Sequence, residues 1–185
     1  LRGQNNVQGA SDAGLIPMFY PDYKAVVDDT QIERWEQFWD TTLDHKKGLT
    51  VVEITEAMYQ KEIKGAYIMG ENPAMSDPDQ SHTREALSRL EHLVVQDIFM
   101  TETAAFADVV LPATAFPEKE GTFTNTDRRV QLGRLAIPAP GQAQQDWWII
   151  QEIAIRMGLR WDYKEVKDIF SEMRQVMASL TGITW

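Results

Sequence analysis

The 185-residue sequence contains no cysteine, and this absence excludes several kinds of site at once. Without cysteine the chain has no disulfide, no thiolate ligand for an iron–sulfur cluster and no cysteine nucleophile. Histidine is scarce as well, because only three are present and none stands in the H-E-x-x-H spacing of a zinc site. The sequence therefore predicts no metal site within this chain.

Long apolar runs and clusters of basic residues are also missing. No run approaches the roughly 18 apolar residues that a membrane-spanning helix needs, so we expect no membrane span. The formal net charge of −10 argues against a nucleic-acid partner, because phosphate binding requires clustered lysine and arginine. Leu1 leads directly into a polar, glycine-containing stretch, which predicts that the chain is a segment of a longer protein.

The common nucleotide and hydrolase motifs are absent too. None of the eleven glycines belongs to a G-x-G-x-x-G or P-loop motif, and no G-x-S-x-G elbow is present. The composition, with 43% apolar and 25% charged residues, is that of an ordinary globular protein. From the residues alone two classes stay open, a cofactor-holding segment of an enzyme and an interaction module.

Short apolar runs alternate with amphipathic segments along the chain. Strands are expected at residues 66–69, 92–96 and 108–111, which lack the in/out alternation of a half-exposed sheet. Helices are expected at 30–40, 50–61 (opened by a Thr50–Glu53 capping box), 77–90, 101–107, 146–157 and 162–177, and residues 1–12 are expected to form a loop. This pattern predicts one α/β domain over residues 1–185, with a parallel sheet covered by helices on both faces.

Polar residues follow each predicted strand, where open α/β sheets bind their ligands. The first strand leads into Gly70–Pro73, the second into Gln96 and Asp97, and the third into a loop that contains Lys119. Each has a plain structural alternative. Gly70–Pro73 is typical of a turn, Lys119 of a solvated surface, and Asp146 of a helix cap.

Four long motifs make the chain recognisable. They are RGQNNVQGASD from Arg2, YIMGENP from Tyr67, the segment from VVQDIFMTETAAFADVVLP to TNTDRRVQ from Val94, and DWWIIQEIAIRMG from Asp146. In this order they resemble the formate dehydrogenase branch of the molybdopterin oxidoreductases, from Arg2 to about Met157. The resemblance implies a Rossmann-like parallel sheet flanked by helices, the middle domain of such an enzyme.

The resemblance also implies a cofactor and a set of partners. Such enzymes hold molybdenum or tungsten between two molybdopterin guanine dinucleotides, and this chain would bind one of them, with residues 1–28 as an active-site loop segment. The iron–sulfur cluster and the cysteine or selenocysteine ligand of the metal would lie in a preceding part of the protein. The expected partners are the remaining domains of the same subunit, electron-transfer subunits and formate. The implied location is cytoplasmic, and the isolated chain is expected to be inactive.

Residue roles follow from the same resemblance. Gln4 is implied at the pterin, Asn72 and Ser76 at the nucleotide portion, and Asp146 at the guanine. The full set of implied cofactor-binding residues is Gln4, Asn72, Ser76, Gln96, Asp97, Lys119 and Asp146. Their chemistry suits the ligand, because a carboxylate accepts the adjacent N1–H and N2–H donors of guanine and Lys119 offers a positive charge to a pyrophosphate.

Arg2 is the implied catalytic residue. A guanidinium binds a carboxylate through two parallel hydrogen bonds, so Arg2 would orient formate beside the metal. Three alternatives remain open at this stage: a related nitrate reductase, a cofactor-free relative in a respiratory NADH dehydrogenase, and a structural interaction domain. The RGQNN stretch favours formate among the enzymes, and the joint presence of the site residues favours a cofactor-binding relative.

Overall fold

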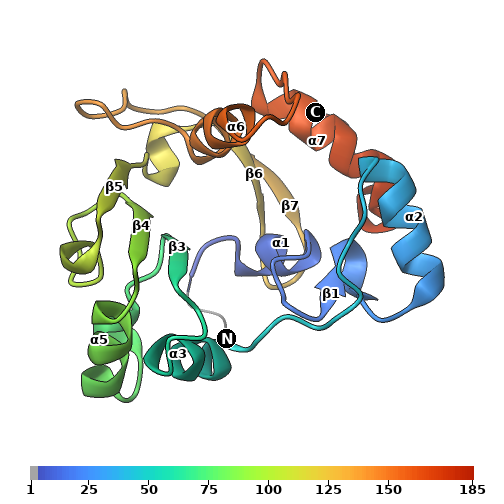
Figure 1. Cartoon of the computed structure of the whole chain (residues 1–185). Coiled ribbons are helices and arrows are strands. Elements are labelled where there is room, and N and C mark those ends of the chain that lie inside the picture. Colours follow the sequence, from blue (N-terminus) through green and yellow to red (C-terminus); the bar gives the residue numbers. More distant parts are fainter. Residues whose placement is uncertain (1–3) are drawn as a thin grey trace. The chain divides into compact units, whose positions relative to one another are not determined.

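Three short strands form a parallel sheet, as the sequence predicts (Figure 1). They are β3 (Gly65–Met69), β4 (His92–Asp97) and β5 (Val109–Pro112), hydrogen-bonded in the order β3-β4-β5. Ala66 pairs with Leu93, and Val95 pairs with Val110. All three predicted strands are confirmed, and each bound lies within one residue of the prediction.

The computed structural model describes residues 4–185, and these fall into two units. The sheet unit comprises Thr50–Lys119 and Leu135–Asp162, and the second unit comprises the chain up to Leu49 with Glu120–Arg134 and Tyr163–Trp185. The helical elements of the sheet unit are α3 (Val51–Tyr59), α4 (Pro73–Ser76), α5 (Gln80–Ser88), η2 (Ala104–Phe106), η3 (Phe116–Glu118) and α6 (Asp146–Arg156).

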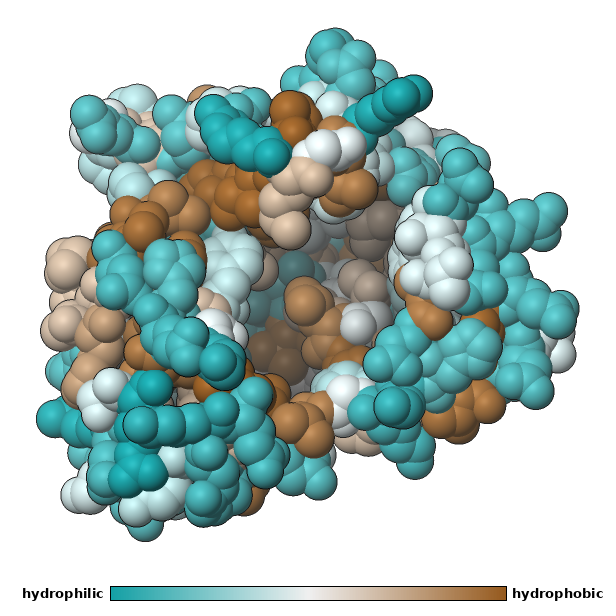
Figure 2. Space-filling view, in the orientation of Figure 1, coloured by the Kyte–Doolittle hydropathy of each residue, from teal (hydrophilic) through white to brown (hydrophobic). Residues whose placement is uncertain are grey.

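Helices α3 and α5 cover one face of the sheet. The buried core that they share with the strands consists of Met58, Ala74, Ala86, Leu87, Leu93, Val95 and Ala104. Ala66, Ile68 and Val110 pack against this cluster from the strands. The outward side of α5 is mostly hydrophilic, whereas hydrophobic side chains show over β5 and η3, where Val109 and Phe116 are 41% and 59% exposed (Figure 2).

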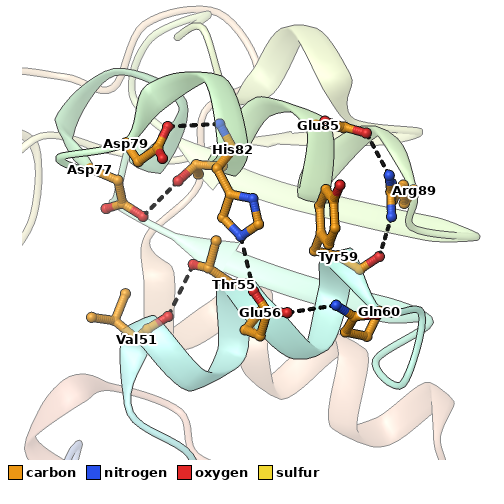
Figure 3. Close-up of polar contacts among 11 residues, drawn as sticks. Val51, Thr55, Glu56, Tyr59, Gln60, Asp77, Asp79, His82, Glu85 and Arg89 are labelled. Atoms are coloured by element: carbon orange, nitrogen blue, oxygen red, sulfur yellow. Dashed lines mark hydrogen bonds and ion pairs between the residues drawn. The ribbon is translucent and has the colours of Figure 1, made fainter.

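Polar contacts tie α3 to α5 above this core (Figure 3). His82 Nε2 lies 3.2 Å from the Glu56 carboxylate. Arg89, at the end of α5, donates to the Tyr59 carbonyl oxygen at 2.6 Å, and its guanidinium lies 3.6 Å from the centre of the Tyr59 ring. The two helices are therefore joined by both apolar and polar contacts.

The other face of the sheet is open at its edge strands. Tyr67, Met69 and Val109 are 45%, 38% and 41% exposed there. The predicted parallel sheet flanked by helices is confirmed, with these three side chains partly exposed on its edge strands. Within residues 4–185, β3 and β5 each have one strand neighbour, and short apolar runs of this kind do not reveal from sequence which of their residues face a helix.

Two helix details also differ from the prediction. The helix expected to open at Asp77 begins at Gln80, because Asp79 is the residue whose carboxylate accepts from the His82 backbone N–H, at 3.0 Å. In α6 the helical spacing of Trp147, Ile150, Ala154 and Met157 predicts that these side chains share the inward face. Of these Ala154 is buried and Met157 is 78% exposed, while Ile149 lies inside. The Trp-Trp-Ile-Ile run fits more than one helical face, so its periodicity does not determine the orientation.

The second unit combines short strands with helices. Its elements are α1 (Val7–Asp12), β1 (Phe19–Tyr20), η1 (Pro21–Tyr23), β2 (Lys24–Ala25), α2 (Asp29–Trp39), β6 (Gly121–Thr124), β7 (Val130–Gly133), α7 (Val166–Val176) and η4 (Ala178–Leu180). The predicted helices at 30–40 and 162–177 are confirmed as α2 and α7. The predicted loop at residues 1–12 is wrong where α1 forms, after Asn6 adopts a left-handed conformation with φ 60°.

The cores of the second unit are aromatic. Trp35 of α2 is fully buried and packs with Tyr20 and Ile32, and a further cluster contains Phe170 and Leu180. Within residues 4–185, no helix has the length and apolar character needed to cross a membrane.

The predicted capping box at the start of α3 is confirmed, and we expect it to stabilise the fold. The Thr50 hydroxyl accepts from the Glu53 N–H at 3.5 Å, and the Glu53 carboxylate accepts from the Thr50 N–H at 2.7 Å. Thr50→Ala should lower the free energy of unfolding by about 1 kcal/mol, whereas Thr50→Ser should nearly preserve it. Urea denaturation followed by circular dichroism checks this, and an equal loss in both variants would assign the effect to packing of the methyl group.

Candidate functional site

Three side chains from distant segments meet at the carboxyl end of β4. Gln96, at 0% exposure, donates from Nε2 to Asp146 Oδ1 at 2.7 Å. Lys119, which follows η3, binds the other carboxylate oxygen of Asp146 with its ammonium group. Both charged side chains are about three-quarters buried, at 25% and 30% exposure, so the pair is only partly screened by water.

Asp146 is not the cap of its helix. The N-cap of α6 is Gln145, and Asp146 is the first helical residue. The capping alternative is therefore wrong as a description of this side chain, whose carboxylate reaches Gln96 and Lys119 instead of a backbone amide of α6. A carboxylate at this position also interacts favourably with the positive end of the helix dipole.

Tyr67 joins the same group and was missed by sequence reasoning. Its hydroxyl donates to Gln96 Oε1. Burial, and then the negative charge of Asp146, raises the pKa of Tyr67 above its ordinary value. The period-2 alternation of β3 and its parallel pairing with β4 are the signals that place Tyr67 beside Gln96, but they require the strand register.

Asn72 links two loops at the strand ends. Its Oδ1 accepts from the backbone N–H and hydroxyl of Thr103 at 3.0 and 2.8 Å, and its Nδ2 donates to Glu102 at 2.7 Å. Ser76 is exposed at the end of α4. Asp97 Oδ1 accepts from the backbone N–H groups of the next two residues, at 2.7 and 3.3 Å, which holds the turn after β4.

The Asn72–Glu102 contact predicts a pH dependence. The hydrogen bond from Asn72 is the main reason that the pKa of Glu102 lies below its ordinary value. A carboxylate whose pKa is lowered by folding stabilises the fold above its unfolded pKa, ~4.3, and loses this contribution as the pH falls through the folded pKa. Glu102→Gln should therefore be less stable than the unaltered chain at pH 7 but not at pH 3. A stability difference that is the same at both pH values in urea titrations would contradict this.

Gln4 lies in the second unit and lines a polar cavity of about 350 Å³. The walls come from the start of α1 and from the turn between β6 and β7, namely Gln4, Asn5, Asn6, Val7, Gln8, Thr124, Asn125, Thr126 and Asp127. Asn6 fixes this arrangement, because its Oδ1 accepts from the Thr124 N–H at 2.9 Å. Arg2, the predicted catalytic residue, lies outside the described residues.

The chemistry of these groups is polar binding. Among residues 4–185, no cluster of three histidine, cysteine, aspartate or glutamate residues could hold a metal ion. The edge of the sheet instead offers a fixed carboxylate, an ammonium group and an amide within hydrogen-bonding distance of one another. Such a set can bind a ligand that carries both N–H donors and negative charge.

Sequence comparison identifies the family and its relatives. Residues 2–156 match the molybdopterin oxidoreductase family. The F420-dependent formate dehydrogenase subunit alpha of Methanocaldococcus jannaschii is 51% identical over all of this chain, which covers 27% of that relative. Formate dehydrogenase H of Escherichia coli is 41% identical, again over the whole chain and 26% of the relative. The chain thus spans about a quarter of the length of these curated relatives.

A solved structure shares the fold. Acetylene hydratase from Pelobacter acetylenicus matches 83% of this chain and 22% of its own, with a TM-score of 0.59 and 23% sequence identity. At that identity the likeness supports the α/β architecture alone.

Proposed function

Because this chain belongs to the molybdopterin oxidoreductase family, we propose that it is part of the catalytic subunit of a formate dehydrogenase. Two relatives that match the whole chain, at 51% and 41% identity, are named as formate dehydrogenases. The reaction would convert formate to carbon dioxide, releasing one proton and two electrons. Since the chain spans a quarter of such relatives, this activity belongs to the complete subunit, together with its other domains and electron-transfer partners.

The sheet unit would bind the guanine end of one molybdopterin guanine dinucleotide through Asp146. The observation that carries this proposal is the carboxylate held by Gln96 and Lys119 at the end of β4, away from the backbone of its own helix. A carboxylate has about four lone-pair positions, so two internal donors leave room for two more. Guanine presents N1–H and N2–H side by side, whereas adenine has no such pair, and Asp146 would therefore select guanine.

The remaining residues would bind other parts of the same kind of ligand. Lys119, whose ammonium group binds Asp146, would add positive charge beside the anionic dinucleotide. Asn72, Ser76 and Asp97 would shape the nucleotide site from the strand-end loops. Gln4, on the wall of a cavity rich in amide and hydroxyl groups, suits the polar edge of the pterin.

Residues 1–185 are proposed to form one dinucleotide-binding domain, of which residues 1–28 are an active-site segment that includes Arg2. A bis-molybdopterin guanine dinucleotide with its metal, when bound, would supply the chemistry of the two-electron oxidation. Arg2 would bind the formate carboxylate through its planar guanidinium and orient it. An iron–sulfur cluster in a preceding part of the subunit and a cytoplasmic location remain predictions from the family resemblance.

The complete subunit tests this proposal against a nitrate reductase. We expect purified complete subunit to contain molybdenum or tungsten and to reduce a dye with formate as electron donor, without nitrate-dependent oxidation of a reduced dye. The 185-residue chain alone should fold and contain neither metal. Nitrate reduction without formate oxidation would contradict formate as the substrate. Stoichiometric molybdenum or tungsten in the isolated chain would contradict the proposal that the metal site needs the other domains of the subunit.

A further inference from the structure

A tyrosine on the open face of the sheet is bonded to the buried end of the Asp146 network. Tyr67 pairs with Val94 across the β3–β4 ladder, and side chains two residues apart on a strand share a face. Gln96, two residues beyond Val94, is therefore a diagonal neighbour of Tyr67. The tyrosine hydroxyl reaches the Gln96 amide oxygen, although Tyr67 is 45% exposed and Gln96 is fully buried.

The direction of this hydrogen-bond chain is fixed by the charge at its end. The Gln96 side-chain amide has an acceptor oxygen, Oε1, and a donor nitrogen, Nε2. Asp146 Oδ1 lies 2.7 Å from Gln96 Nε2, and a carboxylate facing the amide oxygen instead would be repelled. The tyrosine must then donate to Oε1. The raised pKa of Tyr67, due first to burial and then to the Asp146 charge, keeps its proton in place at neutral pH.

We propose that Tyr67 is a positioning residue that determines nucleobase selectivity by locking the Gln96 amide and, through it, the Asp146 carboxylate. This inference rests on the proposed binding of guanine by Asp146. Gln96 holds Oδ1 and Lys119 holds Oδ2, so the plane of the carboxylate is set by two donors on opposite oxygens. A guanine base needs both oxygens in that plane, because its two donors point in parallel.

Removing the tyrosine hydroxyl leaves Gln96 Oε1 without this donor, so the amide is held by Asp146 alone. An amide held at one end can shift, and the carboxylate that it positions is then less well aligned with a base that has two donors. A base with a single donor at this edge is less affected, because one oxygen suffices for it. Hypoxanthine is such a base, since it has the N1–H of guanine without the N2 amino group. The ratio of the affinities for guanine and hypoxanthine therefore measures how far Tyr67 aligns the Asp146 carboxylate.

The test is calorimetric titration of the 185-residue chain with guanosine, inosine and adenosine diphosphates. In Tyr67→Phe the affinity for guanosine diphosphate should fall by about 3- to 10-fold, the loss of roughly one hydrogen bond, while that for inosine diphosphate changes little. Tyr163→Phe is the matched control, because the Tyr163 hydroxyl bonds Glu172 at 2.6 Å in the second unit. It should leave the ratio unchanged.

A double variant separates positioning from a direct role. If Tyr67 acts through Gln96, adding Tyr67→Phe to Gln96→Met should cause no further loss of selectivity. An additional loss of selectivity in the double variant would overturn the inference. So would a Tyr67→Phe variant that loses affinity equally for guanosine and inosine diphosphates, or one whose ratio of the two affinities is unchanged. None of these outcomes would contradict guanine binding itself. Equal affinity of the unaltered chain for guanosine and adenosine diphosphates would instead contradict the proposed function on which the inference rests.

Discussion

Asp146→Ala in the complete subunit is expected to weaken retention of the dinucleotide by about 30- to 150-fold. A charge-assisted pair of hydrogen bonds to guanine is worth on the order of 2–3 kcal/mol, and alanine removes both. The same change leaves Lys119 and the buried Gln96 amide without their shared partner. Guanine nucleotide released by acid denaturation of the purified variant, per mole of protein, measures the effect.

Two variants distinguish guanine binding from helix stability. Asp146→Ser keeps a short polar side chain at the start of α6, so a role in helix stability should largely be preserved. Serine cannot, however, accept two parallel donors as a carboxylate does. It should lose the dinucleotide as Asp146→Ala does. Asp79→Ala removes the carboxylate that caps α5 in the same unit, and it should destabilise the fold while retaining the dinucleotide. Full dinucleotide content in Asp146→Ser would remove Asp146 from the guanine site.

Arg2→Lys in the complete subunit should lower kcat/KM for formate by a factor of about 10 to 100. This corresponds to about 1.4–2.7 kcal/mol of transition-state stabilisation. Lysine keeps the positive charge but lacks the planar fork that binds a carboxylate through two bonds. Metal and dinucleotide contents should stay near those of the unaltered enzyme, because the proposed role of Arg2 is toward substrate.

The alternative for Arg2 is a contact to the cofactor. Steady-state kinetics with formate, combined with metal and nucleotide analysis of the same preparation, separates the two roles. Unchanged formate kinetics would remove Arg2 from the mechanism. Loss of the cofactor would assign Arg2 to cofactor binding.

Local signals in the sequence predicted the sheet unit well. The Thr50–Glu53 capping box and the three apolar strands depend on neighbouring residues, so the printed sequence contains the information that determines them. The β6–β7 hairpin and α4 were not predicted. The β6–β7 hairpin has two four-residue strands, and α4 has four residues, which is too short for a helical period to show.

The site was predictable in kind but not in detail. The rule that ligands lie beyond the carboxyl ends of parallel strands brought Gln96 and Lys119 into consideration. The contact between Gln96 and Asp146 joins residues 50 positions apart, and it depends on where α6 returns to the sheet. Tyr67 was missed because a tyrosine in a strand is first explained by packing, and its partner is visible only once the β3–β4 register is known.

The central claim is that the end of β4 selects a guanine nucleotide, and a titration followed by two-dimensional ¹H–¹⁵N NMR tests it most directly. On addition of guanosine diphosphate to the 185-residue chain, the Gln96 side-chain amide and the backbone N–H of Asp146 should shift together. The resulting Kd should be at least about tenfold lower than for adenosine diphosphate, the difference expected from one charge-assisted hydrogen bond. Shifts confined to other residues, or equal Kd values for the two nucleotides, would contradict the account.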